Sequence, residues 1–330
     1  TNQNSYKKVK ENRFYRNMNI YNDFNSFKKI FKKKIDYTMS SISGIQGLKP
    51  TIEIIKYTKK IAIANKEAII CGWDLIEKRL NKHKTKFIPV DSEHFSIWYA
   101  LKEIDKNLIE KIYLTASGGP FLGKSFRKLN NVNIKQVTNH PNWKMGKKIS
   151  VDSATMMNKV FEIIEARNIF ELPYEKLKIL IHPNSYIHAI VSYENGLVNL
   201  IAHETTMEIP IFNSLFSQNE KKYISKNINL KTLNNLCLQE PNYRKYPLLK
   251  ILKKIPKKQT LYDTIIVAAN DEYIKLFLRN KIKYNEISKK ITKFIYNKEF
   301  NKFKSVISFT VEDILKLDKY VRFKINTSSI

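Results

Sequence analysis

The sequence contains few cysteines and no long apolar stretch. Cys71 and Cys237 are the only cysteines among 330 residues, too few for a disulfide framework, which fits a reducing compartment. No apolar run approaches the ~18–20 residues of a membrane span. The first residues, TNQNSYKKVKENRFYRN, lack the apolar core of a secretory signal. We therefore expect neither a disulfide-stabilised secreted protein nor a membrane protein.

Acidic residues are also scarce relative to basic ones. The chain has 59 Lys and Arg against 30 Asp and Glu, which gives a net charge of +29. Such a charge is typical of proteins that bind nucleic acids by releasing counterions from phosphates. Here the lysines are scattered along the whole length and no DNA- or RNA-binding motif accompanies them. We favour solvated surface lysines, predict no nucleic-acid partner, and expect the positive field to attract a small anionic substrate.

The order of predicted elements indicates an α/β protein of about two domains. The start is hard to interpret, with a short strand at 17–21 and a basic helix at 23–34. Strands are then expected at 35–40, 60–64, 86–90 and 109–117, separated by helices at 51–59, 68–82 and 94–104. This alternation predicts one parallel sheet with ligands at the carboxyl ends of its strands. Further strands follow at 177–182, 187–193 and 197–203, then a linker at 217–245 and a mostly helical end.

Residues 139–168, NHPNWKMGKKISVDSATMMNKVFEIIEARN, combine a loop with a helix. Asp152 and Ser153 are good N-cap residues, so we expect the helix to span 154–168. The apolar positions that recur at helical spacing and predict its buried stripe are Met157, Val160, Phe161 and Ile164.

A second face of this helix is polar. Asn158, Glu162 and Glu165 stand at i, i+4 and i+7, with Lys159 beside them. A hydroxyl, an amide and an ammonium near a helix N-terminus suit a phosphate, and Glu162 could hold a metal or a hydroxyl of the same ligand. A solvated amphipathic helix explains the pattern equally well, so the residues alone leave both interpretations open.

Polar residues also follow the predicted strands. Ser117–Gly118–Gly119 could present a hydroxyl and backbone N–H groups to an anion, and Asn65–Lys66–Glu67 follows another strand. Asp91 and Glu93, two apart in extended backbone, can point the same way and suit Mg²⁺ or Mn²⁺. Alone this pair indicates helix capping more than metal, but Glu162 as a third carboxylate strengthens the metal hypothesis.

Three histidines, His182, His188 and His203, lie among the later strands. Zinc ligation is conceivable, but no cysteine or close histidine spacing of the structural-zinc kind supports it. We favour structural histidines.

Several blocks together resemble the 1-deoxy-D-xylulose 5-phosphate reductoisomerase family. The blocks, spread over roughly residues 41–291, are VDSEH at 90–94, SGGPF at 117–121, HPNWKMGKKISVDSATMMNK at 140–159, LIHPNSYIHA at 180–189 and AAND at 268–271, with Glu162, Glu165, Ala166 and Arg167. The resemblance implies NADPH- and metal-dependent rearrangement and reduction of 1-deoxy-D-xylulose 5-phosphate to 2-C-methyl-D-erythritol 4-phosphate, in a bacterial cytoplasm or a plastid-type organelle.

The resemblance also implies residue roles. Asp91, Glu93 and Glu162 match metal ligands, for Mg²⁺, Mn²⁺ or Co²⁺, and count with Lys159 and His140 as catalytic residues. The residues that match substrate contacts are Ser92, Ser117, His140, Trp143, Ser153, Asn158, Lys159 and Glu162, where His140 and Trp143 belong to a closing loop. Those on the cofactor side are Gly44, Asn65, Lys66, Glu67, Met145 and Gly146.

The implied architecture is a partial Rossmann-like NADPH-binding domain at 1–89, a catalytic α+β domain at 90–216 whose sheet forms a homodimer, the linker at 217–245 and a helical domain at 246–330. One departure concerns the family's Gly-rich pyrophosphate turn, which is absent from this sequence with its eight glycines. We therefore expect that roughly two βα units precede this chain in a longer product, that 35–40 forms an unpaired sheet edge, and that the chain binds NADPH weakly.

Overall fold

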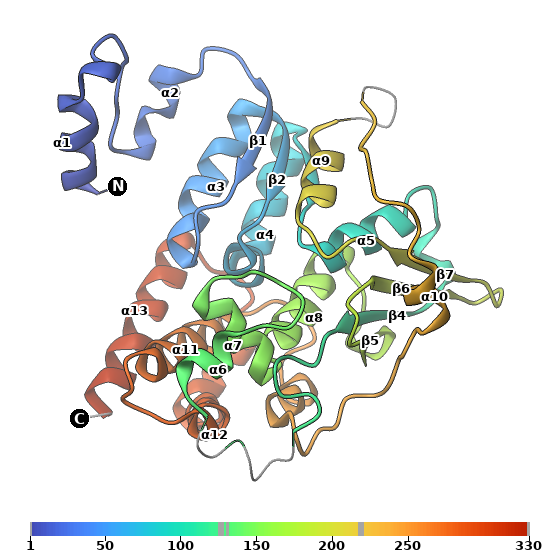
Figure 1. Ribbon diagram of the computed structural model, residues 1–330. Coiled ribbons are helices and arrows are strands. Elements are labelled where there is room, and N and C mark those ends of the chain that lie inside the picture. Colours follow the sequence, from blue (N-terminus) through green and yellow to red (C-terminus); the bar gives the residue numbers. More distant parts are fainter. Residues whose placement is uncertain (1, 125–128, 130–131, 217–220, 329–330) are drawn as a thin grey trace.

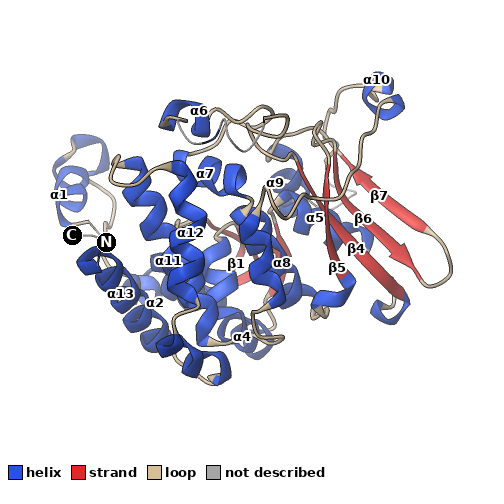
Figure 2. Ribbon diagram, turned by 90° about the horizontal axis from the view of Figure 1, so that it is seen from below, coloured by secondary structure: helices blue, strands red, loops and turns tan. Residues whose placement is uncertain are grey.

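The computed structural model describes residues 2–124, 129, 132–216 and 221–328. The described chain forms two β-sheets, of order β1-β2-β3 and β5-β4-β6-β7, and a helical C-terminal region. Figures 1 and 2 show the larger sheet at one end of the molecule and the C-terminal helices at the other. The mixed α/β class predicted from the sequence is confirmed. No described helix is long and apolar enough to cross a lipid bilayer.

The first 34 residues differ from the prediction. Helix α1 spans Gln3–Glu11 and buries no residue, and a 3-10 turn follows at Arg13–Tyr15. The predicted strand at 17–21 does not form, and the predicted helix at 23–34 is reduced to a 3-10 turn and the four-residue α2, Phe27–Ile30. Among the described strands none pairs with residues 17–21, and a strand is stabilised by its pairing partners more than by local pattern.

The smaller sheet is parallel. It contains β1 (Ile35–Ser40), β2 (Thr58–Ile63) and β3 (Lys86–Pro89), with β1 paired to β2 and β2 to β3. Helices α3 (Leu48–Ile54) and α4 (Lys66–His83) connect them, so α3 ends five residues before the predicted helix does. Among the described residues no strand pairs with the outer side of β1, which matches the predicted edge.

The larger sheet is mixed. β4 (Ile109–Ala116) pairs parallel to β5 (Leu177–Ile181) and antiparallel to β6 (Ile187–Tyr193), which pairs with β7 (Val198–Ala202). The prediction of one parallel sheet that includes 109–117 is therefore wrong. After β3 the chain forms α5 (Ser92–Ala100), and β4 then starts a new sheet. Local periodicity predicts a strand but does not select its pairing partner.

The predicted helix at 154–168 is two helices. α7 spans Lys147–Thr155 and α8 spans Met157–Phe170, and Met156 between them has φ 62°. Asp152 and Ser153 are therefore not N-caps but lie in the last turns of α7. A left-handed conformation is unfavourable for a residue other than glycine, so the break depends on tertiary packing and not on a local sequence signal.

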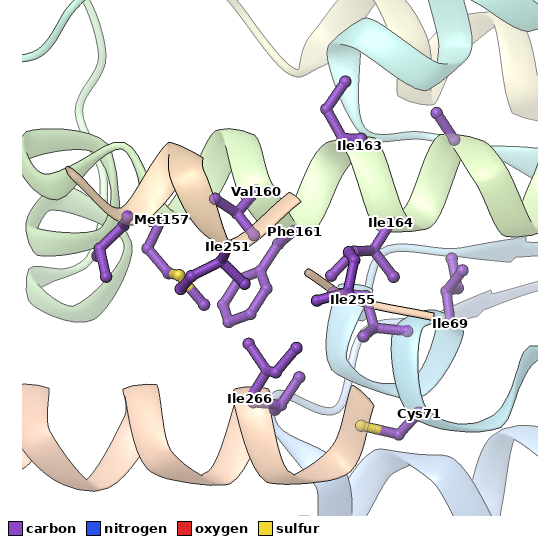
Figure 3. Close-up of a cluster of buried hydrophobic side chains, with 14 of the residues drawn as sticks. Ile69, Cys71, Met157, Val160, Phe161, Ile163, Ile164, Ile251, Ile255 and Ile266 are labelled. Atoms are coloured by element: carbon purple, nitrogen blue, oxygen red, sulfur yellow. The ribbon is translucent and has the colours of Figure 1, made fainter. Parts of the chain in front are cut away.

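The predicted apolar stripe of α8 is buried. Figure 3 shows Met157, Val160, Phe161 and Ile164 facing Ile266, with side chains of other segments around them. Burial of each such side chain contributes about 1.5–3 kcal/mol. The neighbours in Figure 3 come from α4 (Ile69 and Cys71), from the segment 247–255 (Ile251 and Ile255) and from α11 (Ile266).

A buried ion pair also links α8 to the C-terminal helices. Arg167 near the end of α8 donates to Asp263 of α11, with Nη2 2.8 Å from Oδ2, and both side chains are buried. Asp263 also forms a capping box with Thr260 at the start of α11. Together the apolar stripe and the ion pair fix the position of α8 against the C-terminal helices.

The remaining helices are short connections and the C-terminal bundle. The connections are α6 (Ile134–Thr138), α9 (Glu208–Leu215) and α10 (Leu230–Asn234). Within the predicted linker, residues 217–220 lie outside the described chain, while α10 and a bridge from Gln239 to Ile181 give the rest some structure. The bundle comprises α11 (Leu261–Leu278), α12 (Tyr284–Ile295) and α13 (Val311–Ser328), as the predicted helical end requires.

Candidate active site

A cavity of about 280 Å³ lies where the two sheets and α8 meet. It collects most of the residues singled out in the sequence, although they come from five separate segments. Those that line it are Lys66, Asp91, Ser92, Glu93, Ser117, His140, Trp143, Met145, Ser153, Asn158, Lys159 and Glu162. The chemical type of each residue is a local property, and the fold brings these residues to one place.

Three carboxylates converge in this cavity. Oxygen atoms of Asp91, Glu93 and Glu162 all lie within 4.8 Å of one another. Asp91 immediately precedes α5, and Glu93 lies in its first turn. The pair is therefore not in the extended backbone that the sequence analysis expected. Glu162 projects from α8 and is 1% exposed. A set of oxygen donors at this spacing suits a hard divalent cation.

Two lysines lie among the carboxylates. Lys159 Nζ is 3.1 Å from Glu93 Oε1 and 2.5 Å from the carbonyl oxygen of Thr115, and it also pairs with Glu162. Lys66 Nζ is 3.0 Å from Asp91 Oδ2 and 2.8 Å from Asn158 Oδ1. Burial opposes the charge of both ammonium groups, but the surrounding carboxylates outweigh it and raise the pKa of each lysine.

Asp91 and Glu162 differ in how readily they ionise. Burial and the neighbouring Glu93 raise the pKa of Glu162 to about 8. The pKa of Asp91 is lowered well below its usual range, because Lys66 and His94 outweigh the effect of burial. Ionising Glu162 beside two other carboxylates costs free energy. A divalent cation bound among the three carboxylates would stabilise their ionised form. The residues present therefore fit a metal.

A histidine that was not singled out from the sequence connects the ligand-bearing elements. His94 Nε2 is 2.9 Å from the backbone carbonyl oxygen of Glu162, and its Nδ1 is 3.4 Å from Asp91 Oδ1 and 3.7 Å from Glu165 Oε2. Burial opposes protonation, but Glu165 and Asp91 raise the pKa of His94 to about 9. His94 is therefore a buried cation next to the cluster of Asp91, Glu93 and Glu162, which we call the metal-type cluster. Glu165 is its second acidic neighbour after Asp91.

The loop before α7 closes one side of the cavity. His140 Nε2 is 3.0 Å from Ser117 Oγ, and His140 Nδ1 accepts the backbone N–H groups of Asn142 and Trp143 at 3.2 and 3.1 Å. Burial lowers the pKa of His140 to about 4. Since Nδ1 accepts two hydrogen bonds, the proton of the neutral ring lies on Nε2 and the ring donates to Ser117.

The tip of this loop is attached to the turn before β6. Asn142 Nδ2 donates to the carbonyl oxygen of Pro183 at 2.6 Å and to Ser185 Oγ at 2.8 Å. The Trp143 ring meets the ring of His188 edge to face, with centroids 6.1 Å apart. His188 in turn stacks on His203 at 3.8 Å. These contacts attach the loop to the turn before β6 and to β6, and His140, Trp143 and Met145 of the loop line the cavity. Its role as a closing loop stays a prediction.

Four of the residues expected on the cofactor side do not line the cavity. The Asn65 side chain donates to the backbone carbonyls of Ile42 and Gly44 and accepts from Ala68 at the start of α4, so it shapes the loop around Gly44. Glu67 accepts from Lys148 at 2.8 Å. Gly44 and Gly146 have open space where a side chain would be. Their contact with a cofactor stays a prediction.

The cavity also includes residues that were not assigned to a site from the sequence. Those not singled out at all are Ala64, Thr115, Ala116, Lys144, Ile149, Met156, Ser185 and Met207, whereas Gly118 was expected in an anion-binding turn and His188 as a structural histidine. Ser185 and His188 belong to the LIHPNSYIHA block, which was the available signal for them. Among the described residues, the candidate metal-ligand clusters contain none of His182, His188 and His203, and His188 lines the cavity. The structural interpretation of these histidines stays a prediction.

Three family models match this chain. A model described as 1-deoxy-D-xylulose 5-phosphate reductoisomerase matches residues 1–72, and the C-terminal domain model of the same name matches 87–170. A third, the DXP reductoisomerase C-terminal domain, matches 203–324.

Relatives of known name agree with these models. The chain is 56% identical over 313 residues to 1-deoxy-D-xylulose 5-phosphate reductoisomerase of Pelagibacter ubique, which covers 94% of this chain and 81% of the relative. The enzyme of the same name from Clostridium kluyveri is 40% identical over 294 residues, 88% of this chain and 75% of the relative.

Solved structures share the fold. The reductoisomerase of Zymomonas mobilis in complex with NADPH superposes with a TM-score of 0.85 at 28% identity, covering 100% of this chain and 84% of that one. A DOX-P reductoisomerase in complex with NADPH, fosmidomycin and magnesium gives 0.88 at 30% identity, covering 100% of this chain and 85% of that one.

Proposed function

Because the chain belongs to the 1-deoxy-D-xylulose 5-phosphate reductoisomerase family, we propose that it catalyses the reaction of that name. The substrate is the sugar phosphate 1-deoxy-D-xylulose 5-phosphate and the product is 2-C-methyl-D-erythritol 4-phosphate, an isoprenoid precursor. NADPH and a divalent metal, Mg²⁺ or Mn²⁺, are the cofactors. The observation that carries the proposal is the convergence of Asp91, Glu93 and Glu162 beside Lys66 and Lys159 in one closed cavity.

Asp91, Glu93 and Glu162 would hold the metal. When bound, the metal supplies Lewis-acid polarisation of a carbonyl oxygen and compensates negative charge that develops there. The chain's own contribution is to hold the three carboxylates close together, with Glu162 buried and Asp91 and Glu93 partly exposed. Glu162 lies on α8, and the apolar stripe and the Arg167–Asp263 ion pair anchor this helix in the core.

Four residues of the cavity suit the phosphate of the substrate. Ser117 and Ser153 present hydroxyl groups, and Asn158 and Lys159 supply an amide and a charged donor beside the carboxylates. Binding of a phosphate remote from the reacting carbons provides orientation that the reaction can use. We assign these four residues to substrate binding, with Ser92 next to the metal ligands.

The loop with His140 and Trp143 would exclude water from the bound substrate. His140 acts in its neutral form, because its Nδ1 accepts two backbone N–H groups and its pKa is about 4. It therefore donates through Nε2 and does not supply a proton from a charged ring near pH 7. Trp143 covers the cavity and touches His188, and a closed, dry site strengthens each polar contact inside it.

NADPH supplies a hydride when bound. Lys66 and Met145 line the cavity and are the chain's candidates for contact with it, with Gly44, Asn65, Glu67 and Gly146 in the segments beside them. Met145 lies in the closing loop, so loop closure and cofactor binding would be coupled.

A spectrophotometric assay of NADPH oxidation with 1-deoxy-D-xylulose 5-phosphate and Mn²⁺ tests the proposal. We expect turnover that requires both metal and substrate and stops on chelation. Two alternatives give other results: a non-catalytic scaffold would show no metal-dependent oxidation, and a nucleic-acid-binding protein would retain DNA in a gel shift at ~150 mM salt, with steep salt dependence. Absence of metal-dependent NADPH oxidation, with or without DNA binding, would contradict the proposal.

We propose that the chain forms a homodimer through the larger sheet. Among the described residues β7 is an edge strand that pairs only with β6. Leu197, Val198 and Leu200 on and beside it are 64%, 52% and 48% exposed, and an exposed apolar edge favours pairing with another chain. Light scattering should give twice the chain mass, and Leu200→Lys should give a monomer.

We further propose the domain division at residues 89, 216 and 245, and a location in the bacterial cytoplasm. The free thiols of the buried Cys71 and the exposed Cys237 support a reducing compartment. Limited proteolysis that cuts first within 217–245 would support the division.

A further inference from the structure

An ion network centred on Lys148 lies on α7, beside the face of this helix that lines the cavity. Lys148 Nζ is 2.8 Å from Glu67 Oε1, 3.1 Å from Asp152 Oδ2 and 3.0 Å from Asp271 Oδ1. It also lies over the Phe161 ring at 5.4 Å. One side chain thus contacts α4, α7, α8 and α11. None of these partners lines the cavity.

The contacts of Lys148 on α4, α7 and α8 are each adjacent in sequence to a cavity residue, whereas Asp271 on α11 is not. Glu67 follows Lys66, Asp152 precedes Ser153, and Lys148 itself comes three residues after Met145. On α7, Lys148 and Asp152 form one i, i+4 row and Ile149 and Ser153 form the next. The second row faces the cavity, so the first row sets the rotation of the helix that presents it.

The network continues into the C-terminal helices. Asn270 Nδ2 donates to Asp152 Oδ1 at 2.7 Å, which adds a second contact between α11 and α7. Asp271 Oδ2 is 2.9 Å from Arg322 Nη2 of α13, and Arg322 also pairs with Asp318 at 2.8 Å. Asp152 is 1% exposed and Asp271 14%, so solvent screens these pairs much less than surface ion pairs.

We propose that the Lys148 network is a positioning device through which α11 and α13 set ligand affinity at a cavity they do not line. It holds α7 and the start of α4 in the rotation that points Ser153 and Lys66 into the site, and it fixes the end of the closing loop at α7. Lys148, Asp271 and Arg322 are positioning residues. The inference rests on the proposed function, because it takes that site's ligands as its readout.

The test measures the affinity of the full chain for fosmidomycin with Mg²⁺ by calorimetry, beside thermal melts. Asp271→Asn keeps the side-chain shape but removes one charge from the network, and we expect about 5–50-fold weaker binding, the range of ordinary coupling between sites. Arg322→Gln, one step further out, should weaken binding by about 2–5-fold. Asp271→Glu, which keeps the carboxylate, should bind within about threefold of the wild type.

A matched control lies on the same helix as Arg322. Lys324 of α13 pairs with Glu299, whereas the ion pairs of Lys148, Asp271 and Arg322 given above are made with other residues. Glu299→Gln should leave affinity unchanged, within about twofold, even if it lowers the melting temperature.

A double-variant cycle separates positioning from general stability. If Lys148 and Asp271 act through one contact, Lys148→Met/Asp271→Asn should lose less affinity than the product of the two single losses. If Lys148→Met does not fold, because three carboxylates lose their shared cation, Asp271→Asn and Arg322→Gln decide alone. Unchanged affinity in both, with lowered melting temperatures, would overturn the inference. Failure of the wild type to bind fosmidomycin would instead contradict the proposed function.

Discussion

Gly119 is the position where one added methyl group should harm both stability and binding. It has φ +70°, and a Cβ there would lie 2.9 Å from the Ser153 carbonyl oxygen and 3.0 Å from Ala154 Cα. Its N–H donates to Ser117 Oγ at 3.0 Å. The Ser117–Gly119 turn therefore packs directly on the last turns of α7, and Gly119→Ala must move one against the other.

The cost has two parts. A left-handed conformation costs a residue with a Cβ roughly 1–2 kcal/mol, and overpacking against backbone atoms costs about 1–3 kcal/mol. We expect Gly119→Ala to lower the free energy of unfolding by about 2–5 kcal/mol. Because the displaced atoms carry Ser117 and Ser153, affinity for fosmidomycin with Mg²⁺ should fall by about tenfold or more.

Two other glycines separate these parts. Gly196 has φ +83° with nothing within 4 Å of the position that a Cβ would take, so Gly196→Ala should show only the conformational cost. Gly123 has neither a left-handed φ nor a close neighbour, so Gly123→Ala should stay within about 0.5 kcal/mol of the wild type. Denaturant unfolding measures all three. If Gly119→Ala is no more destabilising than Gly196→Ala, the close packing of turn and helix is wrong.

Four further predictions concern the cavity. Glu162→Gln should abolish tight Mn²⁺ binding and turnover, and Mn²⁺ titration with an unchanged affinity would contradict the metal assignment. Because the pKa of Glu162 is about 8, bound metal must displace a proton below that pH, so Mn²⁺ affinity of the wild type should rise by up to tenfold per unit from pH 6 to 8 and level off above. Trp143→Ala should impair turnover with a melting temperature within about two degrees, whereas a loss of ~3–5 kcal/mol of stability would show that Trp143 is a core residue. The pKa of His140 is lowered from 6.5 to about 4, so the stability of the closed loop should fall progressively as pH drops from 6.5 towards 4 and level off below; the fluorescence difference between wild type and Trp143→Phe should follow that decline, and a difference that does not change over this range would contradict the neutral His140.

Much of the local structure followed from short-range pattern. The strand at Ile35–Ser40 was predicted with its observed ends, and the apolar stripe of α8 was buried as its spacing required. Period and residue type are properties of a few neighbouring residues, so they can be read without the fold. The residue types of the site could be predicted from the sequence for the same reason. They are carboxylates, hydroxyls and a lysine at strand ends and on one helix face.

The break at Met156 shows where this reasoning fails. Asp152 and Ser153 have side chains that cap helices well, but Asp152 is buried against Lys148 and Asn270 inside α7. The helix instead ends at a left-handed Met156 that no local rule predicts. Contacts with α11 override the local preference, because a buried ion pair and packing outweigh a cap of about 1 kcal/mol.

The sequence alone thus determined most of the helices and strands after residue 34, the three carboxylates as candidate ligands, and, through long specific blocks, the family. Tertiary structure decided which sheet the strand at Ile109–Ala116 joins, that Lys66 reaches Asp91, and that His94 lies behind the metal-type cluster. It also decided that Lys148 joins four helices. These are contacts between residues tens to hundreds of positions apart, and only the packing of the folded chain selects them from the many pairings that residue type would allow.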